Sequence, residues 1–196
     1  MGSQLENPLL WLDCEMTGLD PRKDRILEVA CILTDGQLKR VQEGPTIVLH
    51  CPKEVLMEMG PWCQEHHGKS GLTEACMRAT TTAAAAEQQI ISFLKENGVG
   101  TGEAILAGNS IHMDKEFLRN EMPGVLEFLH YRILDVSSIK VLATSWFPGL
   151  LPPKKRYMHR ALDDIKESIE ELRYYRENIF VGGSAGDHRT QANAPS

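Results

Sequence analysis

Two acidic residues lie inside the first apolar run of the chain, in the stretch LLWLDCEMTGLD at 9–20. If this stretch is a strand, its side chains alternate between two faces, and Asp13 and Glu15 share one face with Trp11. Two carboxylates on one face are suited to binding a cation. A solvent-exposed strand face would explain the same pair, so the stretch alone leaves both readings open.

A third acid, Asp114, falls on the apolar side of a predicted helix over 111–122. At about 100° per residue, Asp114 sits between Phe117 and Leu118, near the centre of the apolar stripe. A carboxylate directed into a core is costly unless it is paired, hydrogen-bonded or bound to a metal. The alternative is an acid near a helix start that interacts with backbone amides.

The last predicted helix, from about 161 to 178, begins with a pair of acids. Asp164 borders its apolar stripe, whereas Asp163 points nearly opposite, toward solvent, so Asp164 is the candidate ligand. Either acid would also suit the first turn of a helix through the helix dipole. His159 is expected in the loop before this helix, where it can lean over the acids, although a histidine taken alone is commonly a surface residue.

Four carboxylates gathered in one place would repel one another and would not all ionise unaided. Divalent cations remove that conflict, and ligation by carboxylates alone is typical of Mg²⁺ or Mn²⁺. Two such ions about 4 Å apart can hold the attacking and leaving oxygens of an in-line phosphoryl displacement. A histidine can take the proton of the attacking water. Asp13, Glu15, Asp114, Asp164 and His159 therefore predict phosphodiester hydrolysis with two metal ions.

The pattern of DxE at 13–15, Asp114 and HxxxxD at 159–164 resembles the DEDDh family of 3′-to-5′ exonucleases. Longer segments, in order and spanning residue 11 to about 175, resemble the oligoribonucleases within that family, which cleave very short RNA. These segments are WLDCEMTGL, CQEHHGKSGL, GNSIHMDKEFLRNEMP, LHYRILDVSSIK and HRALDDIKESIEELRYY. The resemblance implies an α/β, RNase H-like fold, with a mixed β-sheet flanked by α-helices, and a homodimer.

The resemblance also implies roles for single residues. It assigns the four acids to two divalent cations, Mg²⁺ or Mn²⁺, and His159 to the general base. Leu19 would wedge at the bases, Trp62 would stack on one, and His66 would lie near the scissile phosphate. Tyr131 would reach across from the partner subunit. The residues implied to hold the 5′ phosphate are Ser110, Arg132 and Ser137.

Each of these substrate residues has a simpler reading. Leu19 would be a turn residue that packs locally, and Trp62 would belong to the core. Arg132 would be an ordinary surface charge on a strand. Ser110 and Ser137 would each be the N-cap of a following helix.

Turn signals and apolar patterns predict the elements that position these residues. Strands are expected first, and helices and strands then alternate, which favours an α/β domain with a mixed sheet. Short helical pieces are expected over 53–80. We predict strands at 9–14, 25–35, 46–50, 104–108 and 131–136, and longer helices at 81–97, 111–122, 137–147 and 161–178. Residues 1–180 are expected to form a single exonuclease domain, followed by a disordered tail over 181–196.

Composition excludes few classes of protein. The net charge of −6 gives no bulk basic character with which to attract long nucleic acid, and short substrates need fewer phosphate contacts. No run is apolar enough to span a bilayer, and no transit peptide is visible, so we expect no membrane partner and a cytoplasmic or mitochondrial location. The five cysteines suggest reduced thiols. A zinc site is the weaker alternative, formed by Cys51, Cys63, His66 and His67.

The sequence therefore predicts a metal-dependent 3′-to-5′ exoribonuclease that degrades short single-stranded oligoribonucleotides, down to dinucleotides, to 5′-mononucleotides. A proofreading-type DEDDh exonuclease acting on single-stranded DNA would share the same acids. A protein that binds RNA without cleaving it is a third reading. Loss of any of the five catalytic positions would have favoured that reading, and all five are present.

Overall fold

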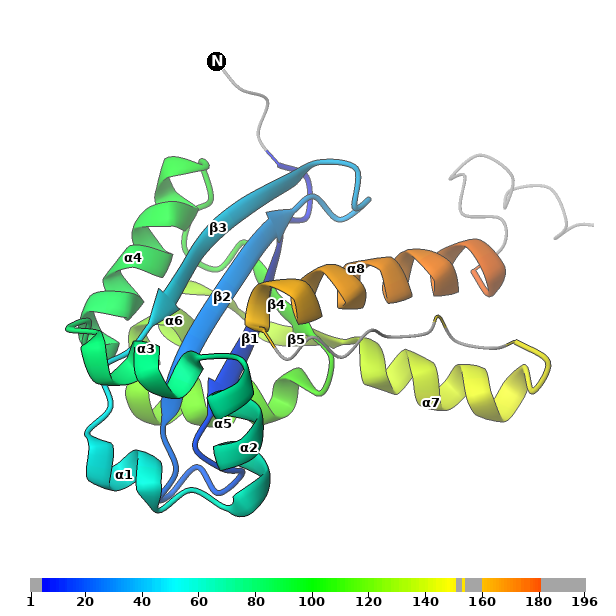
Figure 1. The fold of residues 1–196 in the computed structure, drawn as a ribbon. Coiled ribbons are helices and arrows are strands. Elements are labelled where there is room, and N and C mark those ends of the chain that lie inside the picture. Colours follow the sequence, from blue (N-terminus) through cyan, green and yellow to red (C-terminus); the bar gives the residue numbers. More distant parts are fainter. Residues whose placement is uncertain (1–4, 151–152, 154–159, 181–196) are drawn as a thin grey trace, which may run out of the picture.

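A central five-stranded sheet organises the computed structural model, which describes residues 5–150, 153 and 160–180 (Figure 1). The strand order is β3-β2-β1-β4-β5. β1 pairs antiparallel with β2 and parallel with β4, which confirms the mixed sheet. The strands are β1 (Leu9–Met16), β2 (Ile26–Thr34), β3 (Val41–Val48), β4 (Ile105–Gly108) and β5 (His130–Asp135). His159 and the predicted tail at 181–196 lie outside the described residues.

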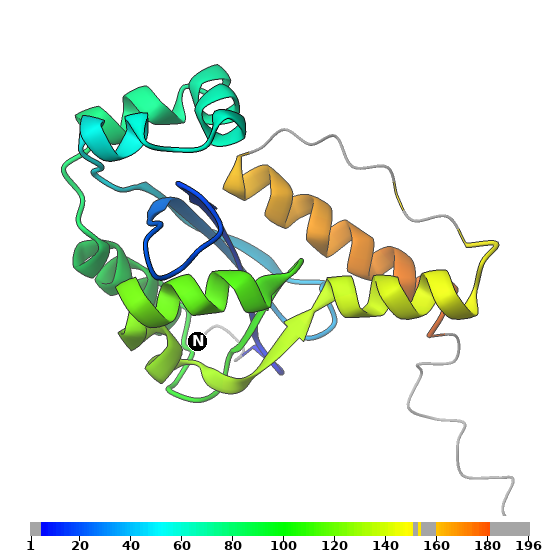
Figure 2. The ribbon, with the colours of Figure 1, turned by 90° about the horizontal axis from the view of Figure 1, so that it is seen from below.

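Helices cover both faces of this sheet, as Figure 2 shows from below. One face packs against α4 (Ala83–Glu96), α5 (Ile111–Glu121) and α6 (Pro123–Phe128). The other face packs against α8 (Ala161–Asn178), which lies beside α7 (Val136–Trp146). The predicted bounds of α8 are confirmed. The sheet flanked by helices is the predicted architecture.

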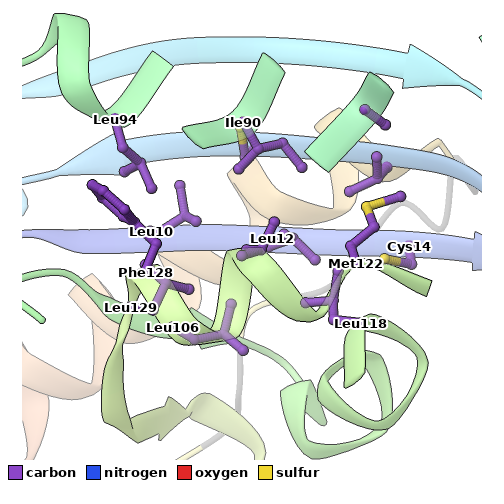
Figure 3. Packing of buried hydrophobic residues seen from close by; sticks show 14 of the residues in the cluster. Leu10, Leu12, Cys14, Ile90, Leu94, Leu106, Leu118, Met122, Phe128 and Leu129 are labelled. Atoms are coloured by element: carbon purple, nitrogen blue, oxygen red, sulfur yellow. The ribbon is translucent and has the colours of Figure 1, made fainter. Parts of the chain in front are cut away.

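The alternation predicted for β1 divides its side chains between two apolar clusters. Leu10, Leu12 and Cys14 join the cluster under α4, α5 and α6, where Figure 3 shows them among side chains of these helices. Leu9 and Trp11 join the cluster under α8. Asp13 and Glu15 follow in the same register as Leu9 and Trp11, so they reach the face that α8 covers.

Three short helices close the end of the sheet at which β1 stops. They are α1 (Lys53–Met57), α2 (Pro61–Lys69) and α3 (Leu72–Arg78), and they confirm the helical pieces expected over 53–80. A third apolar cluster joins them to β2 through Leu27, Leu56 and Leu72. α2 is held to the end of β1 by a hydrogen bond of 2.9 Å between His67 Nε2 and the carbonyl oxygen of Met16.

The structure departs from the predicted elements at β3 and after Pro123. β3 begins at Val41, whereas the sequence predicts a start at 46. The first residues of this edge strand, VQE, are exposed, so they carry no apolar pattern that would predict a strand. Pro123 ends α5 as expected, but it also begins the unpredicted helix α6, since proline suits the first turn of a helix. Among the described residues, no helix is long and apolar enough to cross a membrane.

Candidate active site

Three carboxylates meet where the end of β1 faces the start of α8. Asp13 and Glu15 come from β1, and Asp164 comes from the first turn of α8. One oxygen of each lies within 4.8 Å of the others, and all three residues are half-buried. The sequence predicts that these three acids gather together with Asp114. The structure brings Asp13, Glu15 and Asp164 together as an acid cluster and leaves Asp114 outside that group.

The two neighbouring acids of α8 have different surroundings. Asp163 is exposed, whereas Asp164 is half-buried in the acid cluster. The predicted orientations of both are therefore confirmed. The amide groups of both residues donate to the carbonyl oxygen of Arg160, at 3.0 Å for Asp163 and 3.1 Å for Asp164. The first turn of α8 thus fixes the backbone from which the Asp164 carboxylate extends.

The acid cluster resists full ionisation. Burial, followed by the negative charges of Asp164 and Glu28, raises the pKa of Glu15 from 4.5 to about 8. The positive charge of Arg160 opposes this rise. Oxygen ligands with clustered negative charge are what Mg²⁺ and Mn²⁺ bind in proteins, and a divalent cation would relieve the repulsion. The residues present therefore fit a divalent metal ion.

Asp114 approaches β1 from α5 and is 6% exposed. Its Oδ1 accepts a hydrogen bond of 2.9 Å from the backbone N–H of Cys14, which lies between the two acids of β1. Burial raises the pKa of Asp114 to about 7, although the hydrogen bonds from Cys14 lower it. Asp114 is outside the group of three carboxylates within 4.8 Å, but its charge adds to the rise in the Glu15 pKa.

A cavity of about 520 Å³ opens beside the acid cluster. Leu19 and Trp62 line it and are 74% and 56% exposed, so neither is packed in the core. The loop with Leu19 is held by Asp24, which accepts hydrogen bonds from the Thr17 hydroxyl at 3.1 Å and the Asp20 N–H at 2.9 Å. The cavity therefore joins the acids to exposed apolar side chains on a fixed loop and on α2.

The two neighbouring histidines of α2, His66 and His67, have different surroundings. His66 stacks on the Trp62 ring, with centroids 3.9 Å apart, and its Nδ1 lies 2.8 Å from the Trp62 carbonyl oxygen. His67 is buried, lines the cavity and has its Nδ1 3.9 Å from Glu15 Oε2. From the sequence, His67 is predicted only as a ligand of the alternative zinc site. Cys63 and His67 are four residues apart, which places both on one side of α2. This spacing is the sequence feature that could have placed His67 at the cavity.

The alternative zinc site is not formed within the described residues. Cys51 is buried in the apolar cluster with Leu27 and Cys76. Among the residues that the structure describes, the group close enough to share a metal ion consists of the three acids. His67 directs its Nε2 to the Met16 carbonyl oxygen.

Of the residues implied for the 5′ phosphate, Ser110 and Ser137 come just after the ends of β4 and β5, and Arg132 lies within β5. Asp135 joins two of them, because its Oδ1 accepts from the N–H of Ser110 at 2.9 Å and from the hydroxyl of Ser137 at 2.6 Å. Asp135 is also the N-cap of α7, so the N-cap reading of Ser137 is wrong. Ser110 occupies the N-cap position of α5 with a φ of 52°, but its side chain makes no capping hydrogen bond.

Asp135 keeps its negative charge at this position. Burial raises its pKa, but hydrogen bonds from Ser137 and His112 outweigh that effect, and the net shift is downward. On the adjoining β5, Tyr131 is exposed and stacks on His130, with centroids 4.5 Å apart. The Arg132 guanidinium lies 5.4 Å from the centroid of the Tyr131 ring. These side chains form an exposed aromatic and basic edge.

Comparisons with known proteins agree with this fold and site. The sequence model of the exonuclease family RNase_T matches residues 10–172. Exonuclease I from Methylocaldum szegediense superposes with a TM-score of 0.70 at 22% identity, over 89% of this chain and 41% of that one, so this chain spans about two fifths of its length. The acid cluster and this fold define a nuclease domain of the RNase H-like class.

Relatives narrow the assignment. The mitochondrial oligoribonuclease of Mus musculus is 49% identical over 181 residues, which cover 91% of this chain and 76% of the relative. The oligoribonuclease of Hydrogenovibrio crunogenus is 49% identical over 177 residues, covering 90% of this chain and 96% of the relative. The chain therefore belongs to the oligoribonuclease family of the DEDDh exonucleases. Membership makes it an enzyme of the class that hydrolyses phosphodiester bonds.

Proposed function

We propose that this chain removes 5′-nucleotides one at a time from the 3′ end of short oligoribonucleotides, down to dinucleotides. The observation that carries the proposal is the acid cluster in the wall of a cavity that also presents Leu19 and Trp62. The names of the 49% identical relatives support RNA as the substrate. The likeness to exonuclease I is below 25% identity and supports the fold alone.

Asp13, Glu15 and Asp164 would hold two divalent cations, Mg²⁺ or Mn²⁺, with Asp114 as a fourth ligand. Bound cations supply an activated water and charge stabilisation at the leaving 3′-oxygen. The all-oxygen ligand set and the raised pKa of Glu15 support this proposal. Asp114 orders the β1 backbone between the two strand acids through the Cys14 amide.

The chain's own residues would bind and orient the RNA around this centre. The exposed Trp62 ring offers a stacking surface for one base, already backed by His66, and Leu19 would separate neighbouring bases. His66 would lie near the scissile phosphate. Ser110, Arg132 and Ser137 would hold the 5′ phosphate, and this contact with the 5′ end would favour short substrates. His159, as general base, would take the proton of the attacking water.

A homodimer would complete this site with Tyr131 from the partner subunit. β5 is an edge strand, and exposed apolar side chains continue from it along α7. The exposed large apolar residues of α7 and its end are Val141, Leu142, Trp146 and Phe147. Exposed apolar side chains beside an uncovered edge strand favour a protein contact.

The test of the reaction is a length series of 5′-labelled RNA from two to ten nucleotides, with Mg²⁺ and with Mn²⁺. We expect conversion to mononucleotides, fastest for the shortest RNA, and loss of that conversion in Asp114→Asn. The matched control is Glu116→Gln, because Glu116 lies on the exposed side of the same helix. No conversion by the wild type, or equal rates in Asp114→Asn and wild type, would refute the proposal. A strong preference for long single-stranded DNA would instead favour the proofreading-type alternative.

The dimer has its own test. Trp146→Glu and Val141→Glu place charges on the exposed apolar surface of α7 and should yield monomers by sedimentation velocity. We expect these monomers to lose most activity on dinucleotides, since Tyr131 of the partner subunit would be missing. Thr144→Glu, on an exposed polar position of the same helix, is the comparison variant. A fully active monomer would remove Tyr131 from the site.

The extent of the domain and its location are also proposals. We infer that residues 1–180 act as one exonuclease domain, and a fragment ending at 180 with wild-type kcat and KM would support this. We place the enzyme in the cytoplasm or in mitochondria, since relatives with a mitochondrial name are among the most similar proteins. Imaging of a tagged chain beside a mitochondrial marker separates these two locations.

A further inference from the structure

Glu28 is a charged residue near the start of β2, and its side chain is 0% exposed. In the antiparallel pairing of β1 with β2 it lies directly opposite Glu15. Directly opposed residues of neighbouring strands project to the same face, so Glu28 and Glu15 both face α8. A buried carboxylate is costly unless other groups compensate for its charge.

Within the described part of the chain, the groups that compensate for this charge come from the start of α8. The Arg160 guanidinium binds both oxygens of the Glu28 carboxylate, with Nη2 2.7 Å from Oε1 and Nε 3.3 Å from Oε2. The backbone N–H of Ala161, the first residue of α8, donates to Oε2 at 3.3 Å. One buried carboxylate therefore binds both the side chain before the helix and the helix terminus itself.

Arg160 also links Glu28 to the acid cluster. Its carbonyl oxygen accepts the amide hydrogens of Asp163 and Asp164. A short chain of contacts thus runs from β2 to the backbone of Asp164. In Figure 1 the first turn of α8 lies over the middle of the sheet, where β2 and β1 run side by side.

Stability alone is a weak reason for such a pair. A buried ion pair is often no more stabilising than apolar side chains of the same volume, because removing both charges from water is costly. A second ion pair already links α8 to the sheet, between Lys166 Nζ and Glu43 Oε1 at 2.7 Å, and both of its side chains are about half exposed. The buried pair differs in position, because it holds the helix end that presents Asp164.

We propose that Glu28 is a positioning residue for the metal site, which acts through Arg160 to hold the start of α8 so that the Asp164 carboxylate stays beside Asp13 and Glu15. This role rests on the proposed function. In this role Glu28 would act through its contacts with Arg160 and Ala161, and not as a metal ligand. Residues that orient metal ligands in this way typically change metal affinity about 10- to 100-fold when they are replaced.

The test uses Mn²⁺ alone as the probe, with binding to the full chain followed by electron paramagnetic resonance. Glu28→Gln keeps the side-chain volume and removes the charge, and we expect Mn²⁺ to bind about 10-fold or more weakly. Arg160→Lys keeps a positive charge but loses the forked contact, and an intermediate loss is expected. Arg160 is partly exposed, so this second variant gives a reading even if Glu28→Gln does not fold.

Two controls separate positioning from general destabilisation. Glu43→Gln makes the same chemical change in the exposed ion pair to the same helix and should bind Mn²⁺ within twofold of wild type. Ile169→Val weakens the packing of α8 away from its first turn and should lower the melting temperature without changing Mn²⁺ affinity. On a dinucleotide, Glu28→Gln should need more Mn²⁺ for half-maximal rate but recover kcat when Mn²⁺ saturates.

The outcomes are distinguishable. Wild-type Mn²⁺ affinity in both Glu28→Gln and Arg160→Lys would overturn the positioning role and leave the proposed function intact. Equal losses in Glu28→Gln and Ile169→Val would overturn it as well, because loss of stability would then suffice. A wild-type protein that binds no Mn²⁺ would refute the proposed function, and the positioning role with it.

Discussion

The two faces of the sheet have different interiors. Under α4, α5 and α6 the buried residues of β1 and β2 are apolar, among them Leu10, Leu12 and Val29. Under α8 the same two strands also bury Glu28 and carry Asp13 and Glu15 of the acid cluster. α8 adds Ser168 and Glu171 to this second interior, where Glu171 accepts from Tyr175 OH at 3.0 Å and from Asn109 Nδ2 at 3.0 Å.

The difference shows how one strand serves both packing and chemistry. Successive residues of β1 alternate between the faces, so stability and metal binding are assigned to different residues of the same segment. The acid cluster lies on the face that α8 covers. The N-terminal end of α8 supplies Asp164, and the dipole of the helix favours negative charge there. Asp114 is the exception, since it reaches the β1 backbone from the apolar face.

The largest expected effect is on the α8 face. Asp164→Asn should lower kcat/KM on a dinucleotide by on the order of 10³-fold, because a metal ligand contributes several kcal/mol of charge stabilisation. Asp163→Asn, its exposed neighbour, should remain within about twofold, as expected for a surface change. Steady-state rates at saturating Mg²⁺ measure both variants. Similar losses in the two would show that the helix start, and not the acid cluster, matters.

On the apolar face the expected effect is on stability. Leu12→Ala removes a buried side chain next to Asp13 and should lower the free energy of unfolding by about 2–5 kcal/mol in urea titrations. Leu12 points away from the acid cluster, so the folded variant should keep wild-type Mn²⁺ affinity. A large loss of affinity would mean that the two faces are not independent.

The pH dependence of the metal-free protein tests the cost of the acid cluster. The folded protein holds the Glu15 proton up to about pH 8, whereas the unfolded chain releases it near 4.5. Asp114, with a pKa raised to about 7, acts in the same direction. The free energy of unfolding in EDTA should therefore fall by several kcal/mol as pH rises from 4.5 to 8, since each pKa unit corresponds to about 1.4 kcal/mol.

Two comparisons check that this fall comes from the acid cluster. Saturating Mg²⁺ should remove most of it, since the bound cation favours the ionised acids. Glu15→Gln in EDTA should show a flatter pH profile than wild type. An unchanged slope in that variant would assign the pH dependence to other groups.

A smaller effect is expected at the cavity rim. Trp62→Ala should raise KM for a dinucleotide with little change in kcat, because base stacking contributes about 1–3 kcal/mol to binding. Trp62→Phe should retain most of the affinity. If Trp62→Ala lowers kcat and leaves KM unchanged, the ring would have a role other than stacking.

The residues with a strong local pattern were predicted correctly. The alternation of β1, the apolar stripe of α8 and the opposite orientations of Asp163 and Asp164 all follow from side-chain periodicity, and the structure confirms them. The first half of β3 and the helix α6 were missed. An exposed edge strand has no apolar period, and a proline gives the same signal whether it ends one helix or begins the next.

The contacts that hold the site together could not be predicted from local sequence patterns. The sequence predicts no role for Glu28, Arg160 or Asp24, and it predicts His67 only as a ligand of the alternative zinc site. Glu28 looks like any polar residue within an apolar strand, and its partner lies 132 residues away. Asp24 resembles an ordinary loop acid until its contacts with Thr17 and Asp20 are known.

Local residue patterns predict the acids of this site and the family. Periodicity is a local property, so it assigns Asp13, Glu15, Asp114 and Asp164 to faces, and the order of the motifs indicates the family. Which acids meet, and what holds them, follows from the folded chain. The acid cluster depends on the pairing of β1 with β2 and on the docking of α8, and these long-range contacts leave no mark on the local pattern of residues.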